Sequence, residues 1–207
     1  MTNKLRTLFF FLALAGAATV AAAQTGGLIG ERYAAFDLGY ADFKGGDLRF
    51  AGVELNVPSS IKGLDLSIAT AYGDYDYDLD GLSQKSWKIS AAATGYMEMD
   101  QGIKGFLTGR IGYENADIDF YGYSYTGRKN SFFFDASVGA EIPYSAKGAI
   151  LVAFGYYDYT EWDEGAGYYG TIGAHYWFNR TVGVRGSYTR DFDQDSDEFR
   201  LGVVFRY

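Results

Sequence analysis

Three aspartates, Asp74, Asp76 and Asp78, are the residues whose type and spacing point most directly to chemistry. Residues two apart share a face of an extended strand, so their carboxylates could project together and bind a hard divalent cation weakly. Solvated surface charge is the favoured alternative, because carboxylates are common on exposed loops. The pattern therefore predicts a weak cation face and no resident metal.

Residues suited to catalysis are scarce. The chain has no cysteine, which excludes thiolate catalysis, disulfides and thiolate metal sites, and its one histidine is His175. His175 falls near the end of an alternating segment, with Thr171 as the nearest hydroxyl on the same face, and is interpreted as structural. We predict no catalytic residue, no cofactor and no enzyme activity, although paired aspartates acting without histidine stay an open alternative.

A calcium loop can also be rejected. The run Asp76-x-Asp78-x-Asp80-Gly81 resembles the opening of an EF-hand loop. The twelfth position, however, is Trp87 rather than a bidentate glutamate, and no flanking helices are recognisable.

The composition narrows the class of protein. The formal net charge is −8, and an acidic surface without a basic patch argues against a nucleic-acid partner. With 19 tyrosines, 28 glycines and only 2 prolines, the chain is unusual for a soluble enzyme. Tyrosine excess combined with alternating hydrophobicity favours a β protein at a membrane interface.

The last ten residues, 198–207, form the clearest strand. One face is apolar or aromatic and the other is mostly polar, so the two faces of the strand are expected to meet different environments. The apolar face carries Phe199, Leu201, Val203, Phe205 and Tyr207.

This strand carries a resemblance to a known family. The order of Arg200, Gly202, Phe205 and Tyr207 resembles the C-terminal assembly signal of Gram-negative outer-membrane β-barrels, although that family more often ends in phenylalanine. The resemblance implies a small barrel of the opacity, adhesin-like and small-porin group, exported through the periplasm to the outer membrane. It also implies three partners: the outer-membrane assembly machinery, outer-membrane lipids and lipopolysaccharide.

The first residues are typical of a signal peptide. Lys4 and Arg6 precede an apolar run from Leu8 to Val20, and small residues 21–23 form a cleavage site before Gln24. The apolar run is shorter than the ~20 residues of a spanning helix, which disfavours a retained anchor. We predict a cleaved signal peptide at 1–23 and one barrel domain at 24–207.

Alternation between turn signals indicates about ten strands between residue 33 and the end of the chain. The prediction is an all-β fold, a single transmembrane antiparallel up-and-down barrel; eight strands would require one hairpin to be dismissed. Residues 24–31 are a short glycine-rich lead-in, and residues 116–129 are the longest predicted connection. Short turns at Pro58, Asp100, Pro143 and Asn179 mark the periplasmic end.

A row of tyrosines supports this register. In each odd-numbered strand the apolar face ends in a tyrosine, and a polar residue follows two positions later, as expected for an aromatic girdle below water. The girdle residues are Tyr40, Tyr72, Tyr113, Tyr156 and Tyr188.

Charged residues at inward positions predict a layer inside the barrel. It comprises Asp37, Glu54, Arg110, Asp135, Arg185 and Arg200. We expect Arg110 to pair with Asp135, and Arg185 and Arg200 to approach Asp37. The predicted function is a structural or surface-interaction, adhesin-like barrel with a lumen filled by side chains. The alternative is a narrow passive porin for small solutes, and the sequence names no extracellular ligand.

Overall fold

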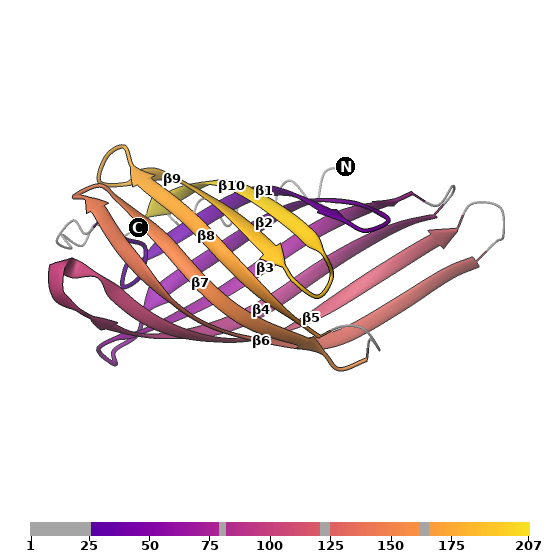
Figure 1. Ribbon diagram of the computed structural model, residues 1–207, viewed down its shortest axis with the longest axis horizontal. Coiled ribbons are helices and arrows are strands. Elements are labelled where there is room, and N and C mark those ends of the chain that lie inside the picture. Colours follow the sequence, from indigo (N-terminus) through magenta and orange to yellow (C-terminus); the bar gives the residue numbers. More distant parts are fainter. Residues whose placement is uncertain (1–25, 79–81, 121–124, 162–165) are drawn as a thin grey trace.

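The computed structural model describes residues 26–78, 82–120, 125–161 and 166–207, and within residues 119–129 the backbone alone. The predicted signal peptide lies outside these ranges, as do Asp80 and Gly81. The described chain forms one closed barrel (Figure 1). Its elements are β1 (Tyr33–Phe43), β2 (Gly46–Pro58), β3 (Leu64–Tyr77), β4 (Leu82–Glu98), η1 (Asp100–Gly102), β5 (Lys104–Phe120), β6 (Tyr125–Ser145), β7 (Gly148–Tyr159), β8 (Gly167–Trp177), β9 (Val182–Asp191) and β10 (Ser196–Arg206).

Each strand pairs antiparallel with its neighbours along the chain, and β1 closes the barrel against β10. The closing register places Tyr33 opposite Arg206 and Tyr40 opposite Phe199. The predicted ten-stranded up-and-down barrel is therefore confirmed. Among the described residues, no helix is long and apolar enough to cross a membrane.

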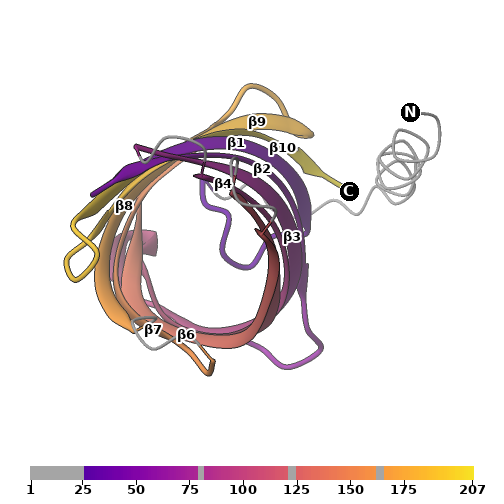
Figure 2. The same cartoon turned by 90° about the vertical axis from the view of Figure 1, so that its right-hand side faces the viewer.

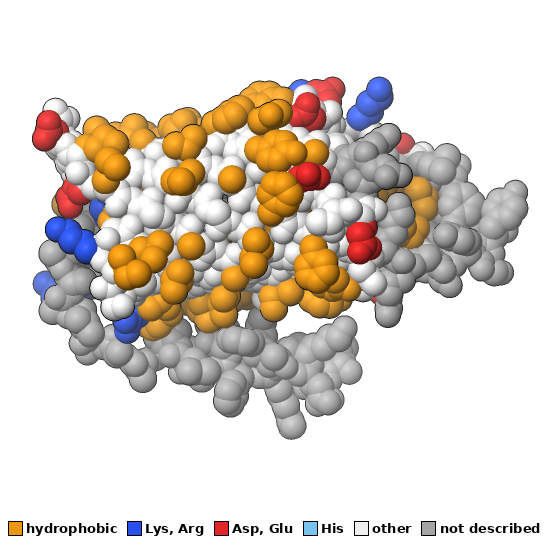
Figure 3. Space-filling model, turned by 90° about the horizontal axis from the view of Figure 1, so that it is seen from below, with side chains coloured by type: hydrophobic (Ala, Val, Ile, Leu, Met, Phe, Trp, Pro, Cys, Tyr) orange, Lys and Arg blue, Asp and Glu red, His pale blue; other side chains and the backbone are white. Residues whose placement is uncertain are grey.

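The outer surface is apolar because the side chains alternate. On β10, Phe199 and Leu201 are 55% and 69% exposed, whereas Gly202 and Val204 on the alternate positions are buried. Orange hydrophobic side chains are spread along the flank of the barrel, and charged ones lie toward its two ends (Figure 3). Such large exposed apolar side chains would be unfavourable in water, so this band is the lipid-facing surface.

The two ends of the barrel differ in how far the strands project. Residues 59–63, 99–103, 146–147 and 178–181 join strands at one end, which is the periplasmic end by the usual topology of such barrels. At the other end, β5 and β6 project beyond the remaining strands (Figure 1).

The predicted long connection at residues 116–129 is mostly strand, which corrects the sequence-based prediction. The β5–β6 ladder continues to Phe120 opposite Tyr125, leaving only 121–124 between the strands. The polar composition of this stretch predicts a loop, but backbone pairing above the membrane does not require apolar side chains. In the backbone register of this extension, residue 117 lies opposite residue 128.

Candidate functional site

A buried ion-pair cluster lies on the inner wall where the barrel closes. Arg185 on β9 donates to Asp37 on β1 at 2.9 and 2.5 Å, and to Glu54 on β2 at 2.8 Å. The Tyr33 hydroxyl donates to Glu54 at 3.1 Å. The side chains of Arg185, Asp37 and Glu54 are 14%, 4% and 19% exposed, so each charge depends on its partners rather than on bulk water.

Gly202 makes this cluster possible. It lies on β10 between the two partners, opposite Asp37 on one side and Arg185 on the other. A Cβ at this position would collide with the Asp37 carboxylate. Gly202, which the sequence assigned to the assembly signal, therefore also leaves room for Arg185 to reach across β10.

Two of the expected luminal pairs do not form. Arg110 and Asp135 are opposite in register, but Asp135 accepts a hydrogen bond from the Tyr169 hydroxyl at 2.6 Å. Within the described part of the chain, Arg110 makes no ion pair. Arg200 pairs with Glu198 at 2.8 Å rather than with Asp37.

Register alone could not predict these partners, because it fixes backbone neighbours and not the directions of long side chains. Tyr169 on β8 reaches Asp135 on β6 by lying over Gly155 of the intervening strand β7, where a Cβ would meet its ring. A glycine on the inner face thus allows a contact between strands that are not adjacent.

A second polar cluster was missed by the sequence analysis. Lys88 on β4 forms a 3.0 Å ion pair with Glu114 on β5, and donates to the Tyr159 hydroxyl at 3.0 Å. Tyr159 in turn donates to Glu114 at 2.9 Å, and the Glu114 side chain is fully buried. The Lys88 ammonium lies 6.0 Å from the centre of the Phe133 ring. The signal was present, because Lys88 and Glu114 occupy inward positions next to Trp87 and Tyr113.

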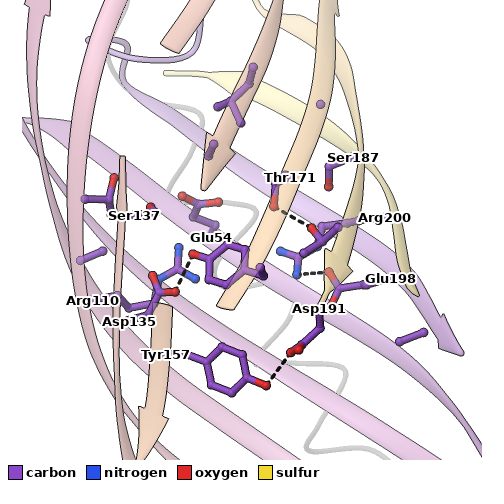
Figure 4. Close-up of a pocket in the computed structure, with 18 of the residues that line it drawn as sticks. Glu54, Arg110, Asp135, Ser137, Tyr157, Thr171, Ser187, Asp191, Glu198 and Arg200 are labelled. Carbon is purple, nitrogen blue, oxygen red and sulfur yellow. Dashed lines mark hydrogen bonds and ion pairs between the residues drawn. The ribbon is translucent and has the colours of Figure 1, made fainter. Parts of the chain in front are cut away.

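The lumen also contains a cavity of about 1200 Å³. It extends from Leu28 and Ile29 near the periplasmic end to Asp193 and Asp195 at the opposite end. Figure 4 shows polar side chains around it, with the Tyr157–Asp191 and Arg200–Glu198 contacts drawn. The predicted lumen filled by side chains is therefore wrong in this region.

The periplasmic end of the lumen is occupied by the chain itself. Residues 26–31, named here the plug segment, lie inside the ring of strands, as the indigo trace in Figure 2 shows. Their contacts involve side chains from β2, β3, β5, β6, β8 and β10. Those side chains are Asn56, Asp65, Lys104, Glu141, His175, Trp177 and Arg206.

Carboxylates hold the amide groups of the plug segment. Glu141 accepts from the backbone N–H of Leu28 at 2.8 Å and of Ile29 at 3.3 Å. Asp65 accepts from the N–H of Gly30 at 2.7 Å. Hydrogen bonds to ionised acceptors are stronger than neutral ones, so these contacts fix the backbone of the segment.

Donors from the barrel hold the carbonyl groups. His175 bonds through Nε2 to the Gly26 oxygen, which requires the proton on Nε2, and Lys104 donates to the Ile29 oxygen. Asn56 donates to the Glu31 oxygen at 2.8 Å. The Glu31 carboxylate completes the set with a 3.1 Å ion pair to Arg206. His175, expected to be structural, lies in this contact.

The girdle tyrosines all lie on the outward face. Tyr40 and Tyr72 are 41% and 51% exposed. Further around the barrel, Tyr113 lies 5.8 Å from Trp87 and 5.2 Å from Phe132, measured between ring centres. Tyr156 and Tyr188 have similar aromatic neighbours, at 5.1 Å from Tyr168 and 5.1 Å from Phe199 respectively. An aromatic rim of this kind suits the lipid headgroup region.

The three rim aspartates are not brought together as one cation site. Asp74, Asp76 and Asp78 are exposed beyond the girdle residue Tyr72. No group of three or more histidine, cysteine or acidic residues in the described ranges could hold a metal ion. Asp74 instead lies opposite Arg49 and Lys85 in the adjoining strands.

The four residues of the assembly signal divide between two faces. Arg200 and Gly202 are directed inward, to Glu198 and toward Asp37 respectively. Phe205 occupies the alternate, outward position, and Tyr207 follows the end of β10.

No protein-family model matches the sequence, and a comparison with curated protein sequences finds no match. Solved structures do share the fold. The β domain of the Bordetella autotransporter BrkA has a TM-score of 0.55 at 12% identity, covering 86% of this chain and 100% of that one. An outer-membrane channel of Pseudomonas putida F1 has a TM-score of 0.53 at 12% identity, covering 91% and 98%.

These features define the class of protein. A closed antiparallel barrel with an apolar outer band is the fold of the outer-membrane β-barrels. The chain accordingly has the fold of an integral membrane β-barrel, shared with outer-membrane proteins of Gram-negative bacteria.

Proposed function

We propose that this protein is a non-enzymatic outer-membrane barrel with a structural or surface-interaction role, and that its lumen does not conduct in the resting state. The observation that carries this proposal is the plug segment. Its backbone is bonded to side chains around the periplasmic end, and Leu28 and Ile29 form the floor of the cavity. A cavity closed at one end suits an outward-facing cup better than a channel.

The contacts of His175 support a non-enzymatic role. His175 is the only histidine, it is 5% exposed, and its Nε2 is bonded to a backbone carbonyl. A general base must reach the proton that it abstracts. A histidine buried against the plug segment is not placed to do so.

The outer end supports a role in surface interactions. The pairing of β7 with β6 ends where Tyr159 lies opposite Phe133. Beyond this point β5 and β6 stay paired with each other and extend the sheet above the aromatic girdle. The exposed aspartates Asp74, Asp76 and Asp78 add negative charge at this end. Lipids and lipopolysaccharide would contact the apolar band and girdle, and an extracellular ligand would meet the extension.

The test is the conductance of the purified protein in a planar lipid bilayer. We expect little or no steady current at moderate voltage, because the plug segment fills the periplasmic end. Heat-modifiable migration on a gel verifies that the inserted protein is folded. A steady current from the folded wild-type barrel would contradict the proposal.

The second candidate function is a passive pore for small solutes. It is favoured by one observation, the cavity of about 1200 Å³, which leaves much of the lumen open to water. Liposome swelling with small sugars discriminates between the two functions. Swelling at the rate of a known porin would support the pore, and none would support the closed barrel.

Assembly should depend on the end of β10. Deleting Tyr207 should sharply lower the yield of heat-modifiable barrel in the outer membrane, because we propose that Tyr207 and Phe205 are recognised by the assembly machinery. Tyr207→Phe, which keeps a terminal aromatic side chain, is the matched control and should assemble at wild-type yield. Wild-type yield from the Tyr207 deletion would exclude this role for the C-terminus.

A further inference from the structure

We propose that the periplasmic end of the barrel is a peptide-binding site whose ligand is the plug segment of the same chain, and that release of the segment opens the lumen. The ligand class is a glycine-rich peptide recognised through its backbone. The inference rests on the proposed closed barrel and adds how the barrel is closed. Each residue from Gly26 to Glu31 has a backbone group that is hydrogen-bonded to a side chain of the barrel. Within the segment, the Glu31 N–H also donates to the Leu28 carbonyl oxygen.

Three buried side chains of the site form their hydrogen bonds with the plug segment. Among the described residues, the side-chain hydrogen bonds of Glu141, Lys104 and His175 all go to the plug segment. Glu141, Lys104 and His175 are 2%, 8% and 5% exposed. Polar groups buried to this degree need partners, and here the plug segment supplies them.

The shape of the site selects glycine. A Cβ at Gly27 would overlap the Glu141 carboxylate that binds the next two amides, and a Cβ at Gly26 would overlap the Ser145 carbonyl oxygen. Gly30 has a φ of +84°, a conformation that residues with a Cβ rarely adopt. The plug segment therefore requires glycine at three positions, as expected for a ligand whose backbone is in close contact with the binding site.

The connection of the segment to the barrel allows reversible release. Only Arg32 separates the plug segment from β1, so a released segment stays tethered at a high effective concentration. Leu28 and Ile29 line the cavity together with Asn56, Asp65 and His175, which bind the plug segment. Removal of the segment would extend the cavity past these side chains to the periplasmic face.

Two variants of the full chain test the role of the segment. One deletes residues 26–30, and the other is Gly27→Val, which places a branched side chain against Glu141. Gly109→Val is the matched control, since a Cβ at Gly109 meets no atom within 4 Å. In single-channel recordings we expect both plug variants to raise the open probability by about tenfold or more, the equivalent of losing one or two hydrogen bonds. The control should stay closed like the wild type.

A peptide added in trans tests recognition directly. The synthetic peptide of residues 24–32, added to both chambers, should close channels formed by the deletion variant, whereas the same peptide with valine at position 27 should not. If the deletion variant fails to fold, the peptide is tested on Gly27→Val, judged folded by heat modifiability.

The outcomes separate this inference from the proposed function. Folded plug variants that stay silent would overturn the inference while leaving the closed barrel intact. A wild type that conducts as steadily as the deletion variant would overturn both. Equal closure by the two peptides, or closure by neither, would overturn backbone recognition at this site.

Discussion

Replacing Arg185 with alanine should lower the free energy of unfolding by about 3 to 5 kcal/mol, because its guanidinium is shared by the buried Asp37 carboxylate and the partly buried Glu54 carboxylate. Arg185 donates to Asp37 and Glu54, which lie on neighbouring strands of the closing seam. Without the guanidinium, two negative charges would face each other, and the Asp37 carboxylate, which is 4% exposed, would lose its partner. The loss should fall toward the lower end of this range, because Glu54 borders the cavity. Equilibrium unfolding in urea, in lipid vesicles, measures the change.

Arg110→Ala is the matched control for this prediction. Arg110 also points into the cavity, but within the described residues it has no ion pair, so its removal should cost less than about 1 kcal/mol. Adding Asp37→Asn to the Arg185→Ala variant should recover part of the loss, since the two residues are in contact and their effects are coupled. Equal losses for Arg185→Ala and Arg110→Ala would contradict the cluster as the source of the stability.

The fold could be predicted from the sequence because a barrel strand has a side-chain period of two. Phe199 and Leu201 face lipid while Arg200 between them faces the lumen, so alternation alone reveals both surfaces. The turn residues then set the number of strands, since β2 ends at Pro58 and Asn179 lies in the turn between β8 and β9. The alternation predicts a connection at residues 116–129, where β5 and β6 in fact continue, because polar strands above the membrane lose the apolar half of the pattern.

The contacts between side chains inside the barrel could be predicted less well from the sequence. Alternation placed Arg110 and Asp135 on the inner face and in register, yet Tyr169 from a third strand is the partner of Asp135. That partner depends on the missing side chain at Gly155 and on the curvature of the wall. A contact between strands that are not adjacent forms only when the sheet is curved into a closed barrel.

The plug segment could not be predicted because its contacts are distant in sequence. Leu28 and Glu141 are 113 positions apart, and Gly26 and His175 are 149 apart. Residues 26–31 have no alternation, so they were taken as a lead-in. The available signal was the coincidence of three glycines next to β1 with buried Glu141 and His175 at strand ends.

The lipid-facing surface gives the second large effect. Ile111→Arg should lower the free energy of unfolding by about 2 kcal/mol, rising toward 4 kcal/mol the closer the position lies to the bilayer centre, because the substitution places a charge in hydrocarbon. Ile111 is 69% exposed on the outer surface and lies one outward position inside the girdle residue Tyr113. Unfolding in thin and thick lipid bilayers measures the change. The loss should be larger in the thicker bilayer, where Ile111 lies deeper below the interface.

Two controls separate charge in lipid from lost packing. Ile111→Gln removes the same apolar contacts without a full charge and should cost less than Ile111→Arg. Thr108→Arg places the charge on the inner wall of the same strand, where it borders the cavity and loses only the 2.9 Å hydrogen bond to Thr94. A hydrated lumen can solvate a guanidinium, whereas acyl chains cannot. Equal losses for the outward and inward arginines, independent of bilayer thickness, would mean that the face assigned to lipid is not in contact with it.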